Sequence, residues 1–195
     1  FPSGVDNEGT EICVVTFSKP WWDLFGNNAM LRGCTGGSGA KTPAQLKSII
    51  NGLETGSSTP YTSALSVVSD TLDSMENRNT DNDNIVVFLS DGEPTDGNGY
   101  IATANALKAS GTVIYSIGFE VTGSAETTLR SLATSSSYYY TGTVSNIESV
   151  FSNIASEIST ESKRSVNGVV EISNVNTTKV IEFKVNGSTS GYPTT

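Results

Sequence analysis

Short apolar runs alternate with amphipathic stretches along most of the chain. Three of the runs have apolar residues side by side: Glu11–Phe17, Ile85–Leu89 and Val113–Ile117. This pattern is typical of strands that are buried on both faces of a parallel sheet. Between the runs, apolar residues recur every three to four positions, which indicates helices that bury one face. The alternation of strands and helices predicts an α/β fold with a doubly wound, mostly parallel sheet.

The first expected helix has a clear start signal. Thr42, Pro43 and Gln45 supply an N-cap hydroxyl, a proline at the first helical position and a side chain that bonds back to the cap. The same apolar spacing predicts further helices after Pro60 and over Tyr100–Ala109, Ala125–Ala133 and Asn146–Ser159. Two short strands are also expected, near Ala29–Arg32 and Tyr138–Tyr140.

The pattern changes after Thr160. Val166–Ile172 and Val180–Val185 carry charges at alternate positions, as strands with one solvent-facing side do. We therefore expect a domain over residues 1–160. Residues 161–195 are expected to form a short β-appendage, either a hairpin or the start of another module.

Composition excludes several classes of function. The 195 residues include no histidine and two cysteines, which excludes Ser-His-Asp and Cys-His catalytic systems, His-ligated zinc sites and Cys₄ zinc sites. A net charge of −9 and the lack of a long apolar run argue against nucleic acid as a partner and against membrane insertion. The polar residues are mainly 28 Ser and 24 Thr, a hydroxyl-rich composition that suits a secreted or cell-surface protein.

The two cysteines, Cys13 and Cys34, lie 21 positions apart and allow two interpretations. In an oxidising compartment they form a disulfide, which contributes about 3 kcal/mol for a loop of this length. In a reducing compartment they are two buried thiols. The sequence leaves both interpretations open.

Two polar features lie where ligands bind in doubly wound folds, at the carboxyl ends of parallel strands. Asp91 directly follows the strand Ile85–Leu89, and Thr59 lies in the loop before a helix. A carboxylate and a hydroxyl are hard oxygen ligands, which suit Mg²⁺, Mn²⁺ or Ca²⁺. Simpler roles are an Asp-Gly turn for Asp91 and an N-cap for Thr59, although Thr62 fits the cap as well.

The residues around these two positions resemble the von Willebrand factor type A (VWA) domain. GSSTPYTSAL over residues 56–65 precedes IVVFLSDGEPTDG over residues 85–97, in the order and spacing of that family. Further matches lie at residues 14–18, 111–119 and 129–158, so the resemblance covers about residues 10–160. It implies a Rossmann-like fold and a metal-ion-dependent adhesion site (MIDAS), most like those of bacterial surface adhesins and pilus-tip proteins.

The resemblance also implies roles for individual residues. In a MIDAS, a threonine, the aspartate of an Asp-Gly turn and a D-x-S-x-S loop hold one divalent cation, and a carboxylate of a partner protein takes the open position. By motif, Thr59 matches the threonine and Asp91 the aspartate, and Gly92 allows the tight turn beneath the metal. The implied cofactor is Mg²⁺, or Mn²⁺ or Ca²⁺, and the implied partner is a protein with an acidic side chain.

The family's first strand, its D-x-S-x-S loop and its first helix have no counterpart in this sequence. In the family's sheet that strand lies between those matched by residues 14–18 and 85–90, so its absence leaves a gap at the centre. An upstream segment or a second fragment is expected to supply it. Asn186–Ser190 reads N-x-S-x-S, but Glu182 and Lys184 would place charges inside a sheet covered on both faces, which favours a chance match.

Other residues near the site have competing interpretations. Glu93 is a candidate for ligand binding, although Glu93 and Asp96 also fit solvated loop carboxylates. Trp21 and Trp22, in a loop rich in Gly and Asn, are either a packing cluster or an exposed anchor for a partner.

We expect a binding module: an extracellular or cell-surface adhesion domain that engages a carboxylate of a partner protein through its cation. The alternative is an intracellular VWA subunit that supports protein assembly or an ATPase or chelatase complex, for which reduced cysteines fit better. A metal-dependent hydrolase of phosphate esters needs more carboxylates at the strand ends than the sequence offers, and the sequence has no P-loop. No enzyme activity is therefore expected.

Overall fold

The computed structural model describes residues 11–18, 29–53, 56–76, 83–164, 181–185 and 188–192. The chain forms two compact units: Glu11–Ile154, and a second unit that includes Ala155–Thr195. Thr59 and Asp91 both belong to the first unit, which therefore contains the candidate cation site.

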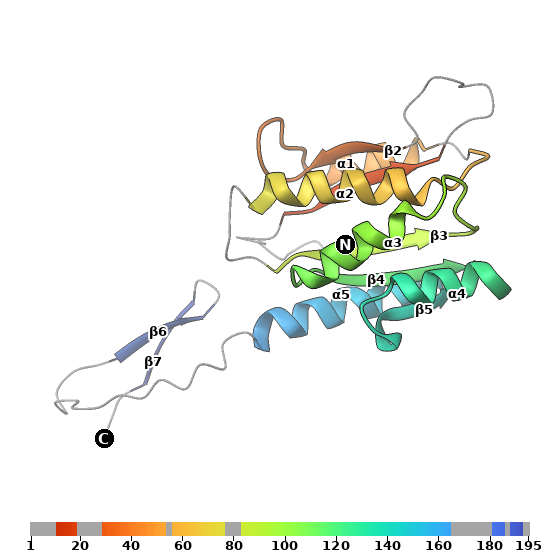
Figure 1. Ribbon diagram of the computed structural model, residues 1–195. Helices are drawn as coiled ribbons and strands as arrows, with labels where there is room; N and C mark the ends of the chain where they lie inside the picture. Colours follow the sequence, from red (N-terminus) through yellow and green to blue (C-terminus); the bar gives the residue numbers. More distant parts are fainter. Residues whose placement is uncertain are drawn as a thin grey trace. The chain divides into compact units, whose positions relative to one another are not determined.

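The first unit has the predicted alternation of strands and helices (Figure 1). Its strands are β1 (Cys13–Phe17), β2 (Ala29–Cys34), β3 (Ile85–Ser90), β4 (Val113–Phe119) and β5 (Tyr139–Gly142). Its helices are α1 (Pro43–Asn51), α2 (Tyr61–Glu76), α3 (Gly99–Ala109), α4 (Gly123–Leu132), the 3₁₀ turn Ser136–Tyr138 and the beginning of α5 (Ile147–Arg164). The α/β fold class predicted from the sequence is confirmed.

The start of α1 has the predicted capping box. The hydroxyl of Thr42 accepts a hydrogen bond from the backbone N–H of Gln45 at 3.2 Å, and the Gln45 side chain accepts one from the backbone N–H of Thr42 at 2.8 Å. Pro43 occupies the first helical position, where a missing N–H costs nothing. Local sequence therefore sets where this helix begins.

The strands form two separate sheets within this unit. β3, β4 and β5 are parallel neighbours in that order, while β1 pairs antiparallel with β2. Among the described residues, β1 has no strand partner besides β2, and β3 has none besides β4. The rings of Phe17 and Phe88 nevertheless stack with their centroids 5.0 Å apart, so β1 and β3 are spatial neighbours. The interruption lies where the sequence predicts that one strand is missing.

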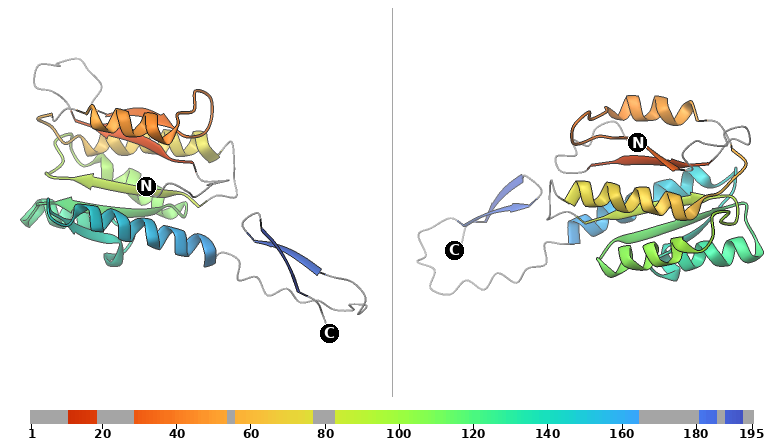
Figure 2. Two further views of the ribbon diagram at one scale, coloured as in Figure 1. Left: turned by 180° about the vertical axis from the view of Figure 1, so that it is seen from behind. Right: turned by 45° about the horizontal axis from the view of Figure 1, so that its top comes forward.

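Helices cover the strands from both sides. In Figure 1, α2, α3 and α4 lie in front of the strands, and the reverse view in Figure 2 brings α1 and the beginning of α5 to the front. The main core lies between the strands and α2, α3 and α4. Its most deeply buried members include Tyr61, Leu65, Ile114 and Leu129.

β1 and β3 are not buried on both faces, contrary to the prediction. All five residues of β1 are half-exposed, and on β3 the side chains of Val87 and Leu89 are 40% and 38% exposed. The residues beside them on β4, Tyr115 and Ile117, are fully buried. Their apolar sequences predict more burial than this. Among the described residues, β1 and β3 each have one edge without a strand partner, and Val87 and Leu89 are exposed on one face of β3.

The second unit contains a small antiparallel hairpin. β6 (Ile181–Val185) pairs with β7 (Ser188–Tyr192), which confirms a strand at Val180–Val185. Ser188–Ser190, the end of the N-x-S-x-S sequence, lie in β7 and pair with β6. That this sequence is a chance match stays a prediction. The other expected strand, Val166–Ile172, lies outside the described residues. The domain boundary at residue 160 stays a prediction.

Candidate metal centre

Thr59 and Asp91 come together at the carboxyl end of β3. Asp91 is the first residue after β3, and Thr59 lies two residues before the start of α2. Two hydrogen bonds join the backbone of Thr59 to the loop that follows Asp91. The Thr59 N–H donates to the Thr95 hydroxyl at 3.1 Å, and the Thr59 carbonyl accepts from the Thr95 N–H at 3.0 Å. The fold therefore brings the two predicted ligands to one edge of the sheet, as the strand order requires.

The Thr59 hydroxyl is oriented so that its oxygen can still act as a ligand. It donates its hydrogen to the backbone carbonyl of Glu93. A hydroxyl has one hydrogen and two lone pairs, so this bond uses the donor and leaves the lone pairs for a cation. A Cβ added to Gly92 would lie 3.4 Å from the Thr59 methyl, which shows how closely the two loops pack.

Asp91 offers a free carboxylate. The residue is exposed, and none of the described residues donates a hydrogen bond to its side chain. An exposed carboxylate beside an oriented hydroxyl oxygen fits a hard divalent cation that keeps several of its waters. The two side chains therefore have the chemistry of part of a cation site.

A hydrogen bond from a buried tyrosine holds the Asp91–Gly92 turn in place. The Tyr61 hydroxyl donates to the Gly92 carbonyl at 2.6 Å. Burial raises the pKa of Tyr61 to about 12, although a hydrogen bond with Ser90 partly opposes this shift. The phenol therefore remains a donor across the neutral range. Gly92 does not have a positive φ, so the left-handed backbone that only glycine adopts easily is not what this turn requires. A Cβ at this position would make only an ordinary contact with Thr59.

Asp96 is not the solvated loop carboxylate suggested by the sequence. Its carboxylate accepts hydrogen bonds from the backbone N–H groups of Thr62 and Ser63, at 3.0 and 2.8 Å. Thr62 is not the N-cap of α2 either, because its hydroxyl accepts the N–H of Tyr100 in α3 at 3.1 Å. One sequence signal points toward such a role: Pro60, directly before α2, has no side-chain oxygen to cap the helix, so its first N–H groups need an acceptor from another segment or from water.

Among the described residues, no contact brings the other predicted ligand-binding residues to Asp91. The Glu93 carboxylate accepts a hydrogen bond from the hydroxyl of Ser124 in α4, so its side chain is directed toward that helix. Its role in ligand binding stays a prediction. Trp21 and Trp22 lie outside the described residues.

Of the two interpretations that the sequence leaves open for the cysteines, the structure has the disulfide. Cys13 in β1 and Cys34 in β2 are directly opposite in the antiparallel pair, with an S–S distance of 1.99 Å. Glu11 lies beside them, and these three are the one group of potential metal ligands that the described residues bring together. Because both sulfurs are bonded to each other, this group is not a thiolate metal site. Within the described residues, Asp91 is therefore not part of a group of three side chains that could hold a metal ion.

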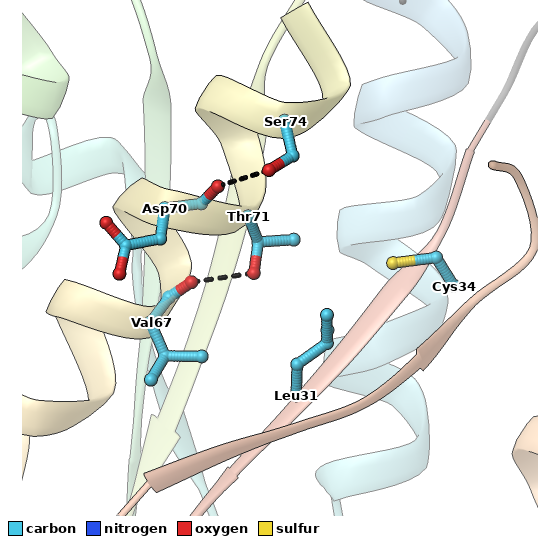
Figure 3. Close-up of a pocket in the computed structure, with 6 residues that line it drawn as sticks. All are labelled: Leu31, Cys34, Val67, Asp70, Thr71 and Ser74. Carbon is cyan, nitrogen blue, oxygen red and sulfur yellow. Dashed lines mark hydrogen bonds between the residues drawn. The ribbon is translucent and has the colours of Figure 1, made fainter. Parts of the chain in front are cut away.

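A pocket lies elsewhere, between β2 and α2 (Figure 3). It has a volume of about 270 Å³ and is lined by Leu31, Cys34, Val67, Asp70, Thr71 and Ser74. The hydroxyls of Thr71 and Ser74 donate to carbonyls of their own helix, at 2.6 and 2.9 Å. Few polar groups therefore remain to orient a ligand there, and the pocket shares no residue with the Thr59–Asp91 site.

The family model for the von Willebrand factor type A domain matches residues 3–183. No curated protein sequence is significantly similar to the chain. Among the helices that the structure describes, none is long and apolar enough to cross a membrane.

Several solved structures share the fold. Proximal thread matrix protein 1 from the mussel byssus aligns with a TM-score of 0.57 at 24% identity, over 73% of this chain and 35% of that chain. A structure of the same mussel protein with a zinc-occupied MIDAS motif gives a TM-score of 0.59 at 23% identity, over 76% and 36%. The pilus adhesin SpaC from Lactobacillus rhamnosus GG gives 0.59 at 15% identity, over 76% and 25%. The chain thus spans about a third of the mussel protein and a quarter of the adhesin.

Proposed function

Because the chain belongs to the von Willebrand factor type A domain family, we propose that it is a binding module that recognises a partner protein through a divalent cation held by Thr59 and Asp91. One observation carries this proposal. At the carboxyl end of β3, a free carboxylate and a hydroxyl oxygen with available lone pairs are held on loops that are hydrogen-bonded to each other. The zinc-occupied MIDAS motif of the mussel protein supports a cation at a site of this kind.

Each residue has a distinct part in this proposal. Asp91 supplies the charge that attracts and holds the cation, and Thr59 supplies a neutral oxygen. When bound, the cation presents an open coordination position that a carboxylate of the partner fills. Mg²⁺ is the expected ion, with Mn²⁺ or Ca²⁺ as substitutes, because all three prefer oxygen ligands. The partner is accordingly a protein with an exposed acidic side chain. Glu93, two residues after Asp91 in the same loop, is a further candidate for contact with that protein.

The site is completed by a strand that the described residues do not contain. β1 and β3 are neighbours, each with an edge that no described strand pairs. We propose that an upstream segment or a second fragment lies between them as a strand, and that the loop after this strand supplies the remaining cation ligands. Val87 and Leu89, exposed on β3, would then be covered by the helix that follows.

The disulfide and the relatives favour an extracellular or cell-surface location. A Cys13–Cys34 bridge persists in oxidising compartments and is rare in the cytosol. The mussel protein comes from the byssus, and SpaC is a pilus adhesin. An intracellular subunit of an ATPase or chelatase complex, the alternative, is less compatible with the bridge. We propose adhesion without enzyme activity.

Acetate provides a direct test of the open position. Mn²⁺ bound by the chain accelerates the relaxation of solvent water protons, because a bound water exchanges with the bulk. If a partner carboxylate takes that position, acetate should displace the water and lower the relaxation enhancement. Acetamide is the matched control, because it has nearly the same shape and no charge, and it should have little effect.

The same titration on Asp91→Ala locates the effect. The acetate-sensitive part of the enhancement should disappear in this variant, while Mn²⁺ bound loosely to other acidic residues remains. Equal responses to acetate and acetamide in the wild-type chain would show that the cation offers no carboxylate position, and the proposed function would be wrong.

A further inference from the structure

We infer that Asp96 is a positioning residue for the cation site: it clamps the Asp91 loop onto the start of α2 and offsets the positive end of that helix. The inference rests on the proposed function, since it concerns the same site. In this role Asp96 binds neither the cation nor the partner directly.

The contacts of Asp96 form a clamp across two parts of the chain. One carboxylate oxygen accepts the Thr62 N–H at 3.0 Å. The other accepts both the Ser63 N–H at 2.8 Å and the Ser63 hydroxyl at 3.0 Å. The backbone carbonyl of Asp96 also accepts the Thr62 hydroxyl at 3.3 Å. Both oxygens of the carboxylate are therefore occupied, so Asp96 is not available as a cation ligand.

These bonds meet a need of the helix. The first N–H groups of a helix have no partner within it, and a side-chain oxygen before the helix usually accepts one of them. Pro60, the residue before α2, has no such oxygen. Asp96 satisfies two of these N–H groups from a loop that is 33 and 34 residues away in the sequence.

The clamp reaches the proposed ligands through Thr95. Thr95 is next to Asp96, and it bonds to Thr59 through both its hydroxyl and its backbone N–H. At the other end of the loop, Tyr61 in α2 holds the Gly92 carbonyl. Because the Thr59 hydroxyl also donates to the Glu93 carbonyl, the loop that carries Asp91 is fixed to α2 and to the segment before it at four places. Asp96 makes the most bonds of the four.

Charge gives Asp96 a second effect. The N-terminus of a helix carries a positive potential equivalent to roughly half an elementary charge. Thr59 lies two residues before α2, so a cation bound there is close to this unfavourable potential. The carboxylate of Asp96, half-buried against the first N–H groups of α2, offsets it. A capping residue without a charge would hold the loop but would not lower this electrostatic cost.

Asp96→Asn removes the charge and one of the two acceptor oxygens, and Asp70→Asn is its matched control. Asn keeps the size of the side chain and one acceptor oxygen, so only part of the clamp can remain in this variant. Asp70 is exposed on the same helix, more than two turns from its start, and lines the pocket between β2 and α2. The measurement is the Kd for Mn²⁺ of the full 195-residue chain, from the electron paramagnetic resonance signal of the free ion. Binding that persists in Asp91→Ala is subtracted.

We expect Asp96→Asn to raise this Kd by about fivefold, the size of a charge effect at a helix terminus, and Asp70→Asn to change it by less than about twofold. Asp96→Ala should weaken Mn²⁺ binding at least as much, and it should also lose the protection of the Thr62 and Ser63 amides from hydrogen exchange. These amide measurements show whether each variant remains folded and whether the clamp has opened.

Two results would overturn the inference. If Asp96→Asn lowers the free energy of unfolding but leaves the Kd unchanged, Asp96 is only a helix cap. If Asp70→Asn weakens binding equally, the effect is one of net charge. If the wild-type chain binds Mn²⁺ no better than Asp91→Ala does, the proposed function itself is wrong. The electrostatic role of Asp96 then fails with it.

Discussion

Asp91→Ala should raise the Kd for Mn²⁺ or Mg²⁺ at this site by at least about tenfold, because it removes the one carboxylate that we assign to the cation. The fold should survive, since Asp91 is exposed and accepts no hydrogen bond from the described residues. We expect the free energy of unfolding without metal to change by less than about 0.5 kcal/mol. Titration calorimetry for the metal and urea unfolding for stability measure the two quantities separately.

Asp73→Ala is the control for this substitution. Asp73 is also an exposed aspartate, on α2, so the variant has the same net charge as Asp91→Ala. Its metal affinity should equal that of the wild-type chain. Metal-dependent binding of a partner should follow the same order: retained in wild type and Asp73→Ala, and lost in Asp91→Ala or in EDTA. If both variants bind metal as the wild type does, the assignment of Asp91 is wrong.

Loss of the disulfide should be the largest change in stability. Replacing Cys13 and Cys34 together by alanine should lower the free energy of unfolding by about 3 kcal/mol, because the bridge restricts the unfolded chain. The bridge joins β1 to β2, and β1 has no other strand partner among the described residues. We therefore expect urea unfolding at a clearly lower concentration in the double variant.

Reduction of the wild-type protein tests the same effect without substitution. A dithiol reductant should shift the unfolding midpoint of the wild type to that of the double variant, and it should leave the double variant unchanged. An unchanged midpoint after complete reduction, checked by thiol titration, would show that the bridge does not stabilise this domain.

The sequence predicts the parts of this site that depend on local pattern and on strand order. Asp91 follows an apolar strand and Thr59 precedes a helix, and in a doubly wound fold both positions come to the same edge of the sheet. The structure places the two loops in direct contact. The helix start at Thr42 is equally local, since its capping box lies within four consecutive residues.

Tertiary contacts set what the sequence does not predict. The bonds from Asp96 to α2 join residues more than 30 positions apart, and nothing in the DGEPTDG sequence distinguishes a solvated aspartate from one that caps a distant helix. The exposure of Val87 and Leu89 has a similar origin. Their apolar character indicates a buried strand, but burial also depends on neighbours that the strand itself does not encode.

The location of a bound cation tests the central claim most directly. Crystals of the chain grown or soaked in Mn²⁺ and measured near the manganese absorption edge would show the ion in an anomalous difference map. We expect a peak within about 2.5 Å of both the Thr59 Oγ1 and a carboxylate oxygen of Asp91. Manganese peaks confined to other acidic residues, with none beside Asp91, would contradict the claim that Thr59 and Asp91 form a cation site.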